Sequence, residues 1–119
     1  MPQILPGGTT RSEAAPRYDL VPSTGPRRIA KRFNLGAEKH GENNWKLSIQ
    51  KEADAFIFCR EAYNHMVEHQ AKMIAMEEPD EDHLGAIGWA VTVIMHVEWL
   101  YGKPWMTLSR GNDSESIGS

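Results

Sequence analysis

Cysteine is nearly absent from the sequence: Cys59 is the single one in 119 residues, so the chain cannot close a disulfide of its own. A chain without disulfides suits a reducing compartment such as the cytoplasm. The apolar neighbours of Cys59, which are Phe56, Ile57 and Phe58, indicate a buried small hydrophobe rather than a nucleophile. We therefore expect a cytoplasmic protein that uses no cysteine chemistry.

Secretion and membrane signals are also lacking. The first residues carry neither the basic stretch nor the apolar core of a signal peptide. The longest apolar stretch, residues 86–99, is too short to span a bilayer and is interrupted by His96 and Glu98. These absences predict a soluble protein with no membrane partner.

Positive charge is scarce, since the formal net charge is −3 and the pI is near 5.9. Such a balance argues against a nucleic-acid binder that works through a broad basic field, and we expect no nucleic-acid partner. One local basic cluster could attract a triphosphate or a nucleic-acid backbone, although a solvated helix face is the more common explanation. Its members are Arg27, Arg28, Lys31 and Arg32.

What the sequence does contain is a helical pattern. A hydrophobic content of 40% can supply one domain with a small core, which oligomerisation would stabilise. Apolar residues recur at helical spacing in three segments, and no segment alternates as a half-buried strand does. We therefore predict an all-α fold, a small bundle of three main helices with flexible arms. The predicted helices are 26–40, 49–76 and 80–101; the predicted domain is 17–104, between an N-terminal arm, 1–16, and a C-terminal tail, 105–119.

The third predicted helix is apolar on nearly every side. Acidic residues in its first turn suit the helix dipole, and Gly102 and Pro104 end it. A helix that is hydrophobic all round is usually buried. We therefore expect it in the centre of the bundle or in the interface of a homodimer or homotetramer.

Acidic and histidine side chains cluster where the second and third predicted helices would meet. Glu61, His65 and Glu68 share one helix face, and the third helix opens with Asp82 and His83. An antiparallel hairpin would bring the two sets together, and helical bundles build metal sites from such side chains. Mg²⁺ or Mn²⁺ would suit these ligands. Alternatively, the acids are simply solvated or favoured by the helix dipole, and His65 is a satisfied, half-buried histidine.

A second group of polar residues follows the first predicted helix. Glu38 could be a ligand or base, Lys39 could meet a phosphate, and Asn44 or Trp45 could contact a base, with Asn43 beside them. The alternative is a helix ended by glycine, an asparagine-rich turn, and a tryptophan tucked over the core.

Four segments resemble, in order, the motifs of one known family. Arg17–Pro22 resembles the opening R-W/Y-D-L-L/I-P, and residues 33–45 resemble the signature F-G-A-x-K-Y-G-x-x-N-W, with His40 in place of the usual tyrosine. Asn64–Met66 resembles R/N-H-L/M, and Glu81–Leu84 resembles E/D-x-H-L. Over most of the chain the sequence is similar to phage dATP/dGTP diphosphohydrolases (MazZ-type, N-terminal domain).

This resemblance implies an all-α relative of the MazG-like pyrophosphohydrolases. These enzymes cleave (deoxy)nucleoside triphosphates to a monophosphate and pyrophosphate with Mg²⁺ or Mn²⁺. The implied role is a phage enzyme in the host cytoplasm that acts on dATP or dGTP and adjusts the purine deoxynucleotide pool. From the pattern and the resemblance together we predict catalytic residues Glu38, Glu61 and Asp82; substrate-binding residues Lys39, Asn43, Asn44 and Trp45; and metal ligands Glu61, His65, Glu68, Asp82 and His83.

MazG-like enzymes carry E-x-x-E followed by E-x-x-D, and this chain has neither motif in plain form. Glu61 is followed by His65, and Glu81-Asp82-His83 stands where the second motif is expected. A second prediction therefore stays open. It is a non-catalytic nucleotide-binding or host-interacting phage protein on a degenerated hydrolase scaffold, which would bind nucleotide without forming product.

Overall fold

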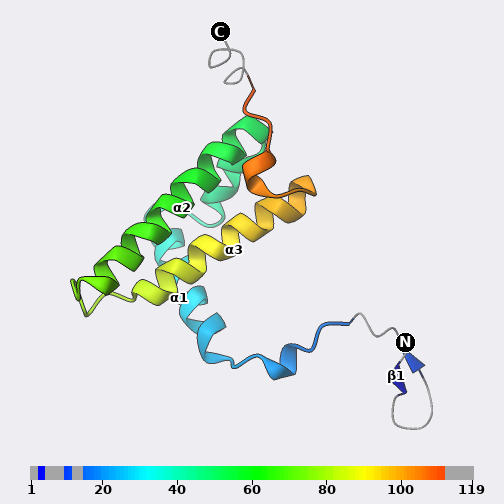
Figure 1. Cartoon of the computed structure of the whole chain (residues 1–119), viewed down its shortest axis with the longest axis horizontal. Helices are drawn as coiled ribbons and strands as arrows, with labels where there is room; N and C mark the ends of the chain where they lie inside the picture. Colours follow the sequence, from blue (N-terminus) through cyan, green and yellow to red (C-terminus); the bar gives the residue numbers. More distant parts are fainter. Residues whose placement is uncertain (1–2, 5–9, 12–14, 112–119) are drawn as a thin grey trace.

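The computed structural model describes residues 3–4, 10–11 and 15–111, and the fold is all-α. Three long helices make up the body, with three short 3₁₀ helices before, between and after them. A pair of two-residue strands stands apart from the helices (Figure 1). The long helices are α1 (Thr24–His40), α2 (Glu52–Ile74) and α3 (His83–Tyr101); the 3₁₀ helices are η1 (Tyr18–Leu20), η2 (Asn44–Ile49) and η3 (Trp105–Thr107); the strands are β1 (Gln3–Ile4) and β2 (Thr10–Arg11).

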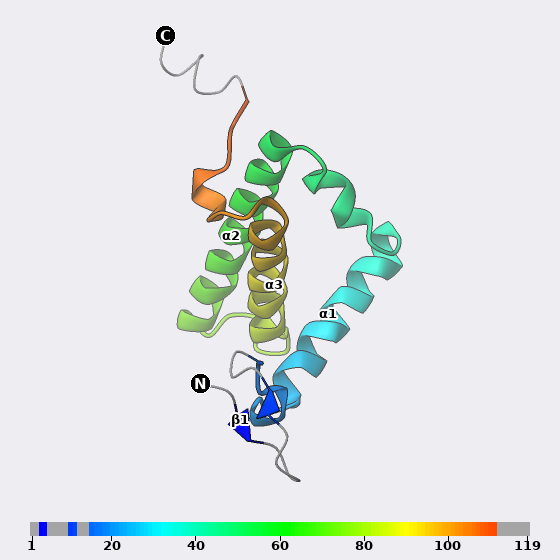
Figure 2. The same cartoon turned by 90° about the vertical axis from the view of Figure 1, so that its right-hand side faces the viewer.

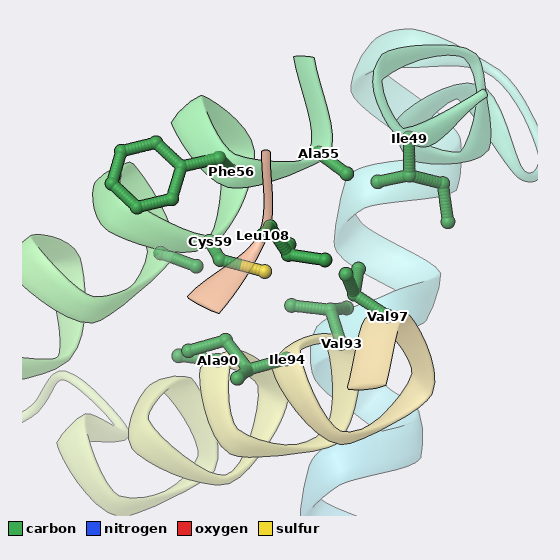
Figure 3. Packing of buried hydrophobic residues seen from close by; sticks show 10 residues of the cluster. Ile49, Ala55, Phe56, Cys59, Ala90, Val93, Ile94, Val97 and Leu108 are labelled. Carbon is green, nitrogen blue, oxygen red and sulfur yellow. The ribbon is translucent and has the colours of Figure 1, made fainter. Parts of the chain in front are cut away.

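The core lies between α2 and α3, which form an antiparallel hairpin (Figure 1). Small residues at the contact let the two helices approach closely, since Ala55, Cys59 and Ala90 have no exposed surface (Figure 3). Val93 and Val97 are equally buried and fill the space between them. The predicted burial of Cys59 is confirmed. Burial and the charge of Glu98 raise the pKa of its thiol to about 11, so it is not a nucleophile at neutral pH.

Helix α1 packs against α3 on the side away from α2 (Figure 2). No residue of α1 is fully buried, and a half-buried stripe that includes Ile29 and Phe33 makes the contact. Gly88 permits the approach, because a Cβ atom there would lie 2.6 Å from Cγ1 of Ile29. Arg28 pairs with Asp82 and Arg32 pairs with Glu81, which attaches the first half of α1 to the α2–α3 turn.

Helix α3 begins at His83, later than predicted, because Asp82 is its N-cap. Asp82 Oδ1 accepts a hydrogen bond from the Gly85 backbone N–H at 3.0 Å. Gly102 ends the helix in the left-handed region at φ 71°, as its position predicts. By length and composition α3 would pass for a membrane-spanning helix, a test that the buried helix of a soluble protein also passes.

Helix α3 is not covered on every side within one chain, so of its two predicted places, the bundle centre and a subunit interface, the second stays a prediction. Its α2 and α1 faces are covered, but a third, apolar face is open. Leu84, Val91, Met95 and Trp99 lie along this face with exposed fractions of 52%, 39%, 55% and 75%. We call these four residues the open face of α3.

Helix α2 is shorter than predicted at both ends. Ile49 lies in η2, and Met76 and Glu78 adopt the left-handed region at φ 59° and 47°, which ends the helix ahead of Pro79. Helix α1, by contrast, runs through Gly36 without a break.

The predicted arms fall largely outside the described residues, which do not include 1–2, 5–9, 12–14 and 112–119. Their flexibility stays a prediction. The packed body extends past the predicted boundary at residue 104: Leu108 is buried in the core, and Trp105 lies 5.6 Å from Phe56 between ring centroids. The tail lies beside α2 because these apolar side chains pack against the first turns of that helix.

Candidate functional site

An aromatic depression of about 600 Å³ lies where α1, η2, α2 and α3 meet. Its walls include Phe33, Trp45, Phe58 and Trp89, one from each of these elements. Trp45 stacks on Phe58 at 6.0 Å between ring centroids, and Phe33 lies 6.2 Å from Trp89. Offset and tilted aromatic pairs of this kind are mutually stabilising. The result is a preformed apolar wall with one open side.

The turn after α1 supplies the polar edge of the depression. Gly41 ends α1 at φ 94°, and its N–H donates to the carbonyl of Ala37 at 2.9 Å. Asn43 then adopts φ 57°, a left-handed conformation that asparagine tolerates. This reversal turns η2 back toward α2, so that Asn43, Asn44 and Trp45 all line the depression. Trp45 therefore packs against the core and also lines the depression, while its contact with a base stays a prediction.

Glu61 lies at the junction of three adjoining depressions, and Phe58 lines all three with it. The aromatic depression also contains Glu42; a neighbouring one of about 360 Å³ contains Asp54; a third, of about 210 Å³, contains His65. Predicted site residues that are distant in sequence thus line depressions that adjoin at Glu61. Asp54 and Glu42 were missed, although the seven-residue spacing of Asp54 and Glu61 on α2 could have indicated the first of them.

Other predicted metal ligands are engaged elsewhere. Asp82 accepts hydrogen bonds from Arg28 (Nε to Oδ2, 3.3 Å) and from the Gly85 N–H, and the Arg28 guanidinium lowers the pKa of this carboxyl. His83 uses both of its ring nitrogens, since Nδ1 lies within hydrogen-bond distance of His69 and Nε2 lies 2.9 Å from the carbonyl oxygen of Glu78. Glu68 is exposed on α2 outside these depressions. Among the described residues, no group of three or more His, Cys, Asp or Glu side chains could hold a metal ion.

Three histidines form a chain of hydrogen bonds at the α2–α3 turn. His69 Nδ1 lies 2.8 Å from His83 Nδ1, and His69 Nε2 lies 3.2 Å from His65 Nε2. The predicted meeting of the end of α2 with the start of α3 is therefore confirmed. His69 is the central member of this chain and is 5% exposed.

Burial and nearby positive charge favour the neutral imidazoles of His65 and His69. Burial lowers the pKa of His65, and Arg32 and Lys72 lower it further. Burial also lowers the pKa of His69, with smaller contributions from the charges of its neighbours.

Glu38 and Lys39 are exposed on α1 and do not line the three depressions. Within the basic cluster, Arg28 and Arg32 pair with acids of the α2–α3 turn. These two arginines therefore help to hold α1 against that turn.

The chain is therefore a small all-α protein, and carboxylates border its aromatic depression. Residues 6–105 match the family model described as dATP/dGTP diphosphohydrolase, N-terminal. The match covers most of the chain, and the chain belongs to this family. The family predicted from the motifs is therefore confirmed. No curated protein and no solved structure matches the chain.

Proposed function

We propose that this protein is a metal-dependent pyrophosphohydrolase that converts dATP or dGTP to the monophosphate and pyrophosphate. The observation that carries the proposal is the position of Glu61, a carboxylate at the open junction of an aromatic depression and two smaller ones. The family's name, taken from a dATP/dGTP diphosphohydrolase, supports the same chemistry.

The aromatic depression suits a purine base. Its volume of about 600 Å³ falls in the usual range for small-molecule sites. Stacking a base on an aromatic side chain is worth about 1–3 kcal/mol, and Trp45 and Phe58 offer such a surface. The amides of Asn43 and Asn44 can donate to and accept from the edge of a base, which would add preference among bases.

Glu61 is the candidate ligand for Mg²⁺ or Mn²⁺, and Glu42 and Asp54 are further carboxylates that line the same depressions as Glu61. The chain alone offers no complete metal cage among its described residues. Mg²⁺ is commonly held by one or two carboxylates together with the phosphates of a substrate, so this donor set fits a site that the nucleotide completes. A bound ion would neutralise phosphate charge and acidify water.

A homodimer also belongs to this proposal. The open face of α3 consists of Leu84, Val91, Met95 and Trp99, and covering it would remove large apolar side chains from water. A second copy of the chain could pair α3 with its own α3. A single small domain gains stability from such burial.

Product analysis tests the proposed activity. The purified chain is incubated with each dNTP and NTP in the presence of Mn²⁺, Mg²⁺ or EDTA, and the products are separated by anion-exchange chromatography. We expect monophosphate plus pyrophosphate from dATP or dGTP, and none with EDTA.

Glu61→Gln should abolish turnover while leaving the helical circular-dichroism signal unchanged. Glu77→Gln is the matched control, because it removes the same charge from an exposed site at the α2–α3 turn, away from the depressions. Full turnover by Glu61→Gln would exclude Glu61 as the carboxylate that carries the reaction.

A non-catalytic nucleotide-binding protein is the second candidate. The lack of a group of three or more metal-ligating side chains among the described residues favours it. It predicts nucleotide affinity by calorimetry with no product from any nucleotide and metal.

A further inference from the structure

We propose that the nucleotide lies across the junction at Glu61, with its base in the aromatic depression and its triphosphate in the depression of about 360 Å³, and that the Ser48 hydroxyl donates a hydrogen bond to the α-phosphate. This inference rests on the proposed function and deepens it, because it assigns the orientation of the substrate and a further binding residue. The side chains that the adjoining depressions share carry the inference.

The two smaller depressions that adjoin the aromatic one differ in the polarity of their walls. The depression of about 360 Å³ is lined by Asp54 and Ser48 as well as by Glu61. The depression of about 210 Å³ is lined by apolar and aromatic side chains apart from Glu61 and His65. A triphosphate is highly charged and must keep polar partners when it leaves water. The depression with two carboxylates and a serine is therefore the one that suits the phosphates.

The two carboxylates of this depression give the triphosphate a direction. Asp54 and Glu61 are seven residues apart on α2, about two turns, which separates them by roughly 10 Å along the helix. Glu61 also lines the aromatic depression, so the phosphate nearest the sugar lies beside Glu61 and the other two extend toward Asp54. Carboxylates repel a bare triphosphate, so this arrangement requires Mg²⁺ or Mn²⁺ between them and the phosphates.

Ser48 lies at the boundary between the aromatic depression and the depression with two carboxylates. It lines both of them, together with Phe58 and Glu61, and it is exposed. A nucleotide that extends from one depression to the other has its sugar and α-phosphate at this boundary. The hydroxyl of serine can donate one hydrogen bond, and a phosphate oxygen is a charged acceptor.

The backbone on both sides of Ser48 is anchored. Ile49 is 3% exposed in the core, and its carbonyl oxygen accepts a hydrogen bond from the Tyr101 hydroxyl at 2.6 Å. Three residues before Ser48, Trp45 stacks on Phe58. A residue held between two such anchors loses little freedom when it binds a ligand, so more of its hydrogen bond contributes to affinity.

The 3′-hydroxyl of the deoxyribose is the other group of the nucleotide that lies near this boundary. A hydrogen bond to a charged phosphate oxygen is roughly twice as strong as one between neutral groups. We therefore assign the Ser48 hydroxyl to the α-phosphate, and the experiments below distinguish it from the sugar.

Calorimetry with the α,β-methylene analogue of dGTP or dATP, whichever the native chain binds more tightly, tests the contact in Mg²⁺. The methylene bridge replaces the bond that hydrolysis would break. Ser48→Ala should raise the Kd of the analogue about 10–100-fold, the usual effect of losing a hydrogen bond to a charged group. Ser48→Thr keeps the hydroxyl and should bind nearly as tightly as the native chain.

Ser23→Ala is the matched control for this experiment, because Ser23 is exposed at the start of α1 and its side chain makes no capping hydrogen bond. Its Kd should equal the native value. Since Ser48 is exposed as well, both variants should keep the native circular-dichroism spectrum. An unchanged Kd for Ser48→Ala would overturn the inference.

The 2′,3′-dideoxy form of the same analogue separates the phosphate from the sugar. If the hydroxyl of Ser48 donates to the α-phosphate, Ser48→Ala should weaken the binding of both forms by the same factor. A substitution that weakens the deoxy form but has no effect on the dideoxy form would show a contact with the 3′-hydroxyl and would overturn the assignment.

Nucleotides with different numbers of phosphates test the direction of the triphosphate. Asp54→Asn should raise the Kd of the triphosphate analogue in Mg²⁺ about tenfold or more. It should leave the Kd of the corresponding monophosphate unchanged, because a monophosphate ends beside Glu61. Asp80→Asn is the control, since Asp80 is exposed at the α2–α3 turn and lines none of the three depressions. Equal effects of Asp54→Asn on both ligands, or none on either, would overturn the orientation.

The outcomes also separate this inference from the function beneath it. If the native chain binds the analogue with the expected effects of the variants but forms no product from any nucleotide, the proposed activity is overturned and the orientation stands. If the native chain turns over nucleotide while Ser48→Ala keeps the native Kd and kcat/KM, the assignment of Ser48 is overturned and the activity stands. A native chain that binds no nucleotide overturns both.

Discussion

At the scale of single residues, Asp82 shows how a side chain predicted for catalysis can serve the fold. Its carboxylate caps α3 through the Gly85 N–H and also pairs with Arg28. Asp82→Ala should lower the free energy of unfolding by about 1 kcal/mol, the usual cost of losing an N-cap. Asp82→Asn should lose less, because asparagine caps well and the exposed ion pair contributes little. Urea denaturation measures both, and equal losses would contradict the capping role.

The histidine chain should make stability depend on pH. Burial lowers the pKa of His65 and His69 below the ordinary value of 6.5, so the unfolded chain binds more protons than the folded one as pH falls. The stabilisation is complete above about pH 6.5 and is lost as pH falls through the lower folded values. We expect the free energy of unfolding to decrease between pH 7 and 5, measured by urea titration at several pH values.

His69→Gln is the control for this pH dependence, because glutamine does not titrate and its slope should be smaller. The ion-paired carboxylates Glu81 and Asp82 have lowered pKa values, so their contribution is lost only at more acidic pH. A native slope identical to that of His69→Gln would contradict the role given to His69.

At the scale of elements, the contact between α1 and α3 depends on Gly88. A Cβ atom at this position would lie 2.6 Å from Cγ1 and 2.8 Å from Cδ1 of Ile29, so Gly88→Ala must push α1 outward. Overpacking of this kind costs about 1–3 kcal/mol. Gly36→Ala is the matched control, because nothing lies within 4 Å of its Cβ and the helix should gain about 0.5–1 kcal/mol. Thermal melts should place the native protein between the two variants.

The sequence was sufficient to predict the three helices and the α2–α3 hairpin, but not where α1 and η2 pack against them. Apolar spacing predicted all three helices, and their ends shifted by two or three residues where Asp82 caps α3 and where Met76 and Glu78 turn left-handed. The short 3₁₀ helix η2 was missed because its apolar residues have no helical repeat. Without it, nothing in the sequence indicated that Trp45 would return to α2.

Only some of the predicted site residues lie together in the structure. Glu61, His65 and the Asn43–Trp45 turn were named from the sequence, and the structure gathers them around adjoining depressions. The engagement of Asp82 by Arg28 could not be foreseen, since these residues lie 54 positions apart. Pairing of that kind depends on tertiary packing, which single-sequence periodicity does not contain.

At the scale of the whole molecule, the open face of α3 should govern assembly. Met95 is 55% exposed at its centre, and a charge there would make burial against a second copy costly. We expect the native chain to be a dimer and Met95→Glu to be a monomer, with unchanged helicity, in size-exclusion chromatography with light scattering. Leu47→Glu is the control, because Leu47 is also an exposed apolar residue, at 65%, but lies on η2 rather than on α3. A monomeric native chain would contradict the proposed dimer.

The two arginine pairs that attach α1 to the α2–α3 turn have a consequence for ionic strength. Exposed pairs are screened by salt, and the Debye length falls from about 10 Å at 0.1 M to about 3 Å at 1 M. The hydrophobic hairpin of α2 and α3 is not weakened in this way. Rising salt should therefore loosen α1 first, and acrylamide should quench Trp45 and Trp89 more strongly while the melting temperature changes little. The aromatic depression would then widen as the salt concentration rises, which would ease the access of a nucleotide to it.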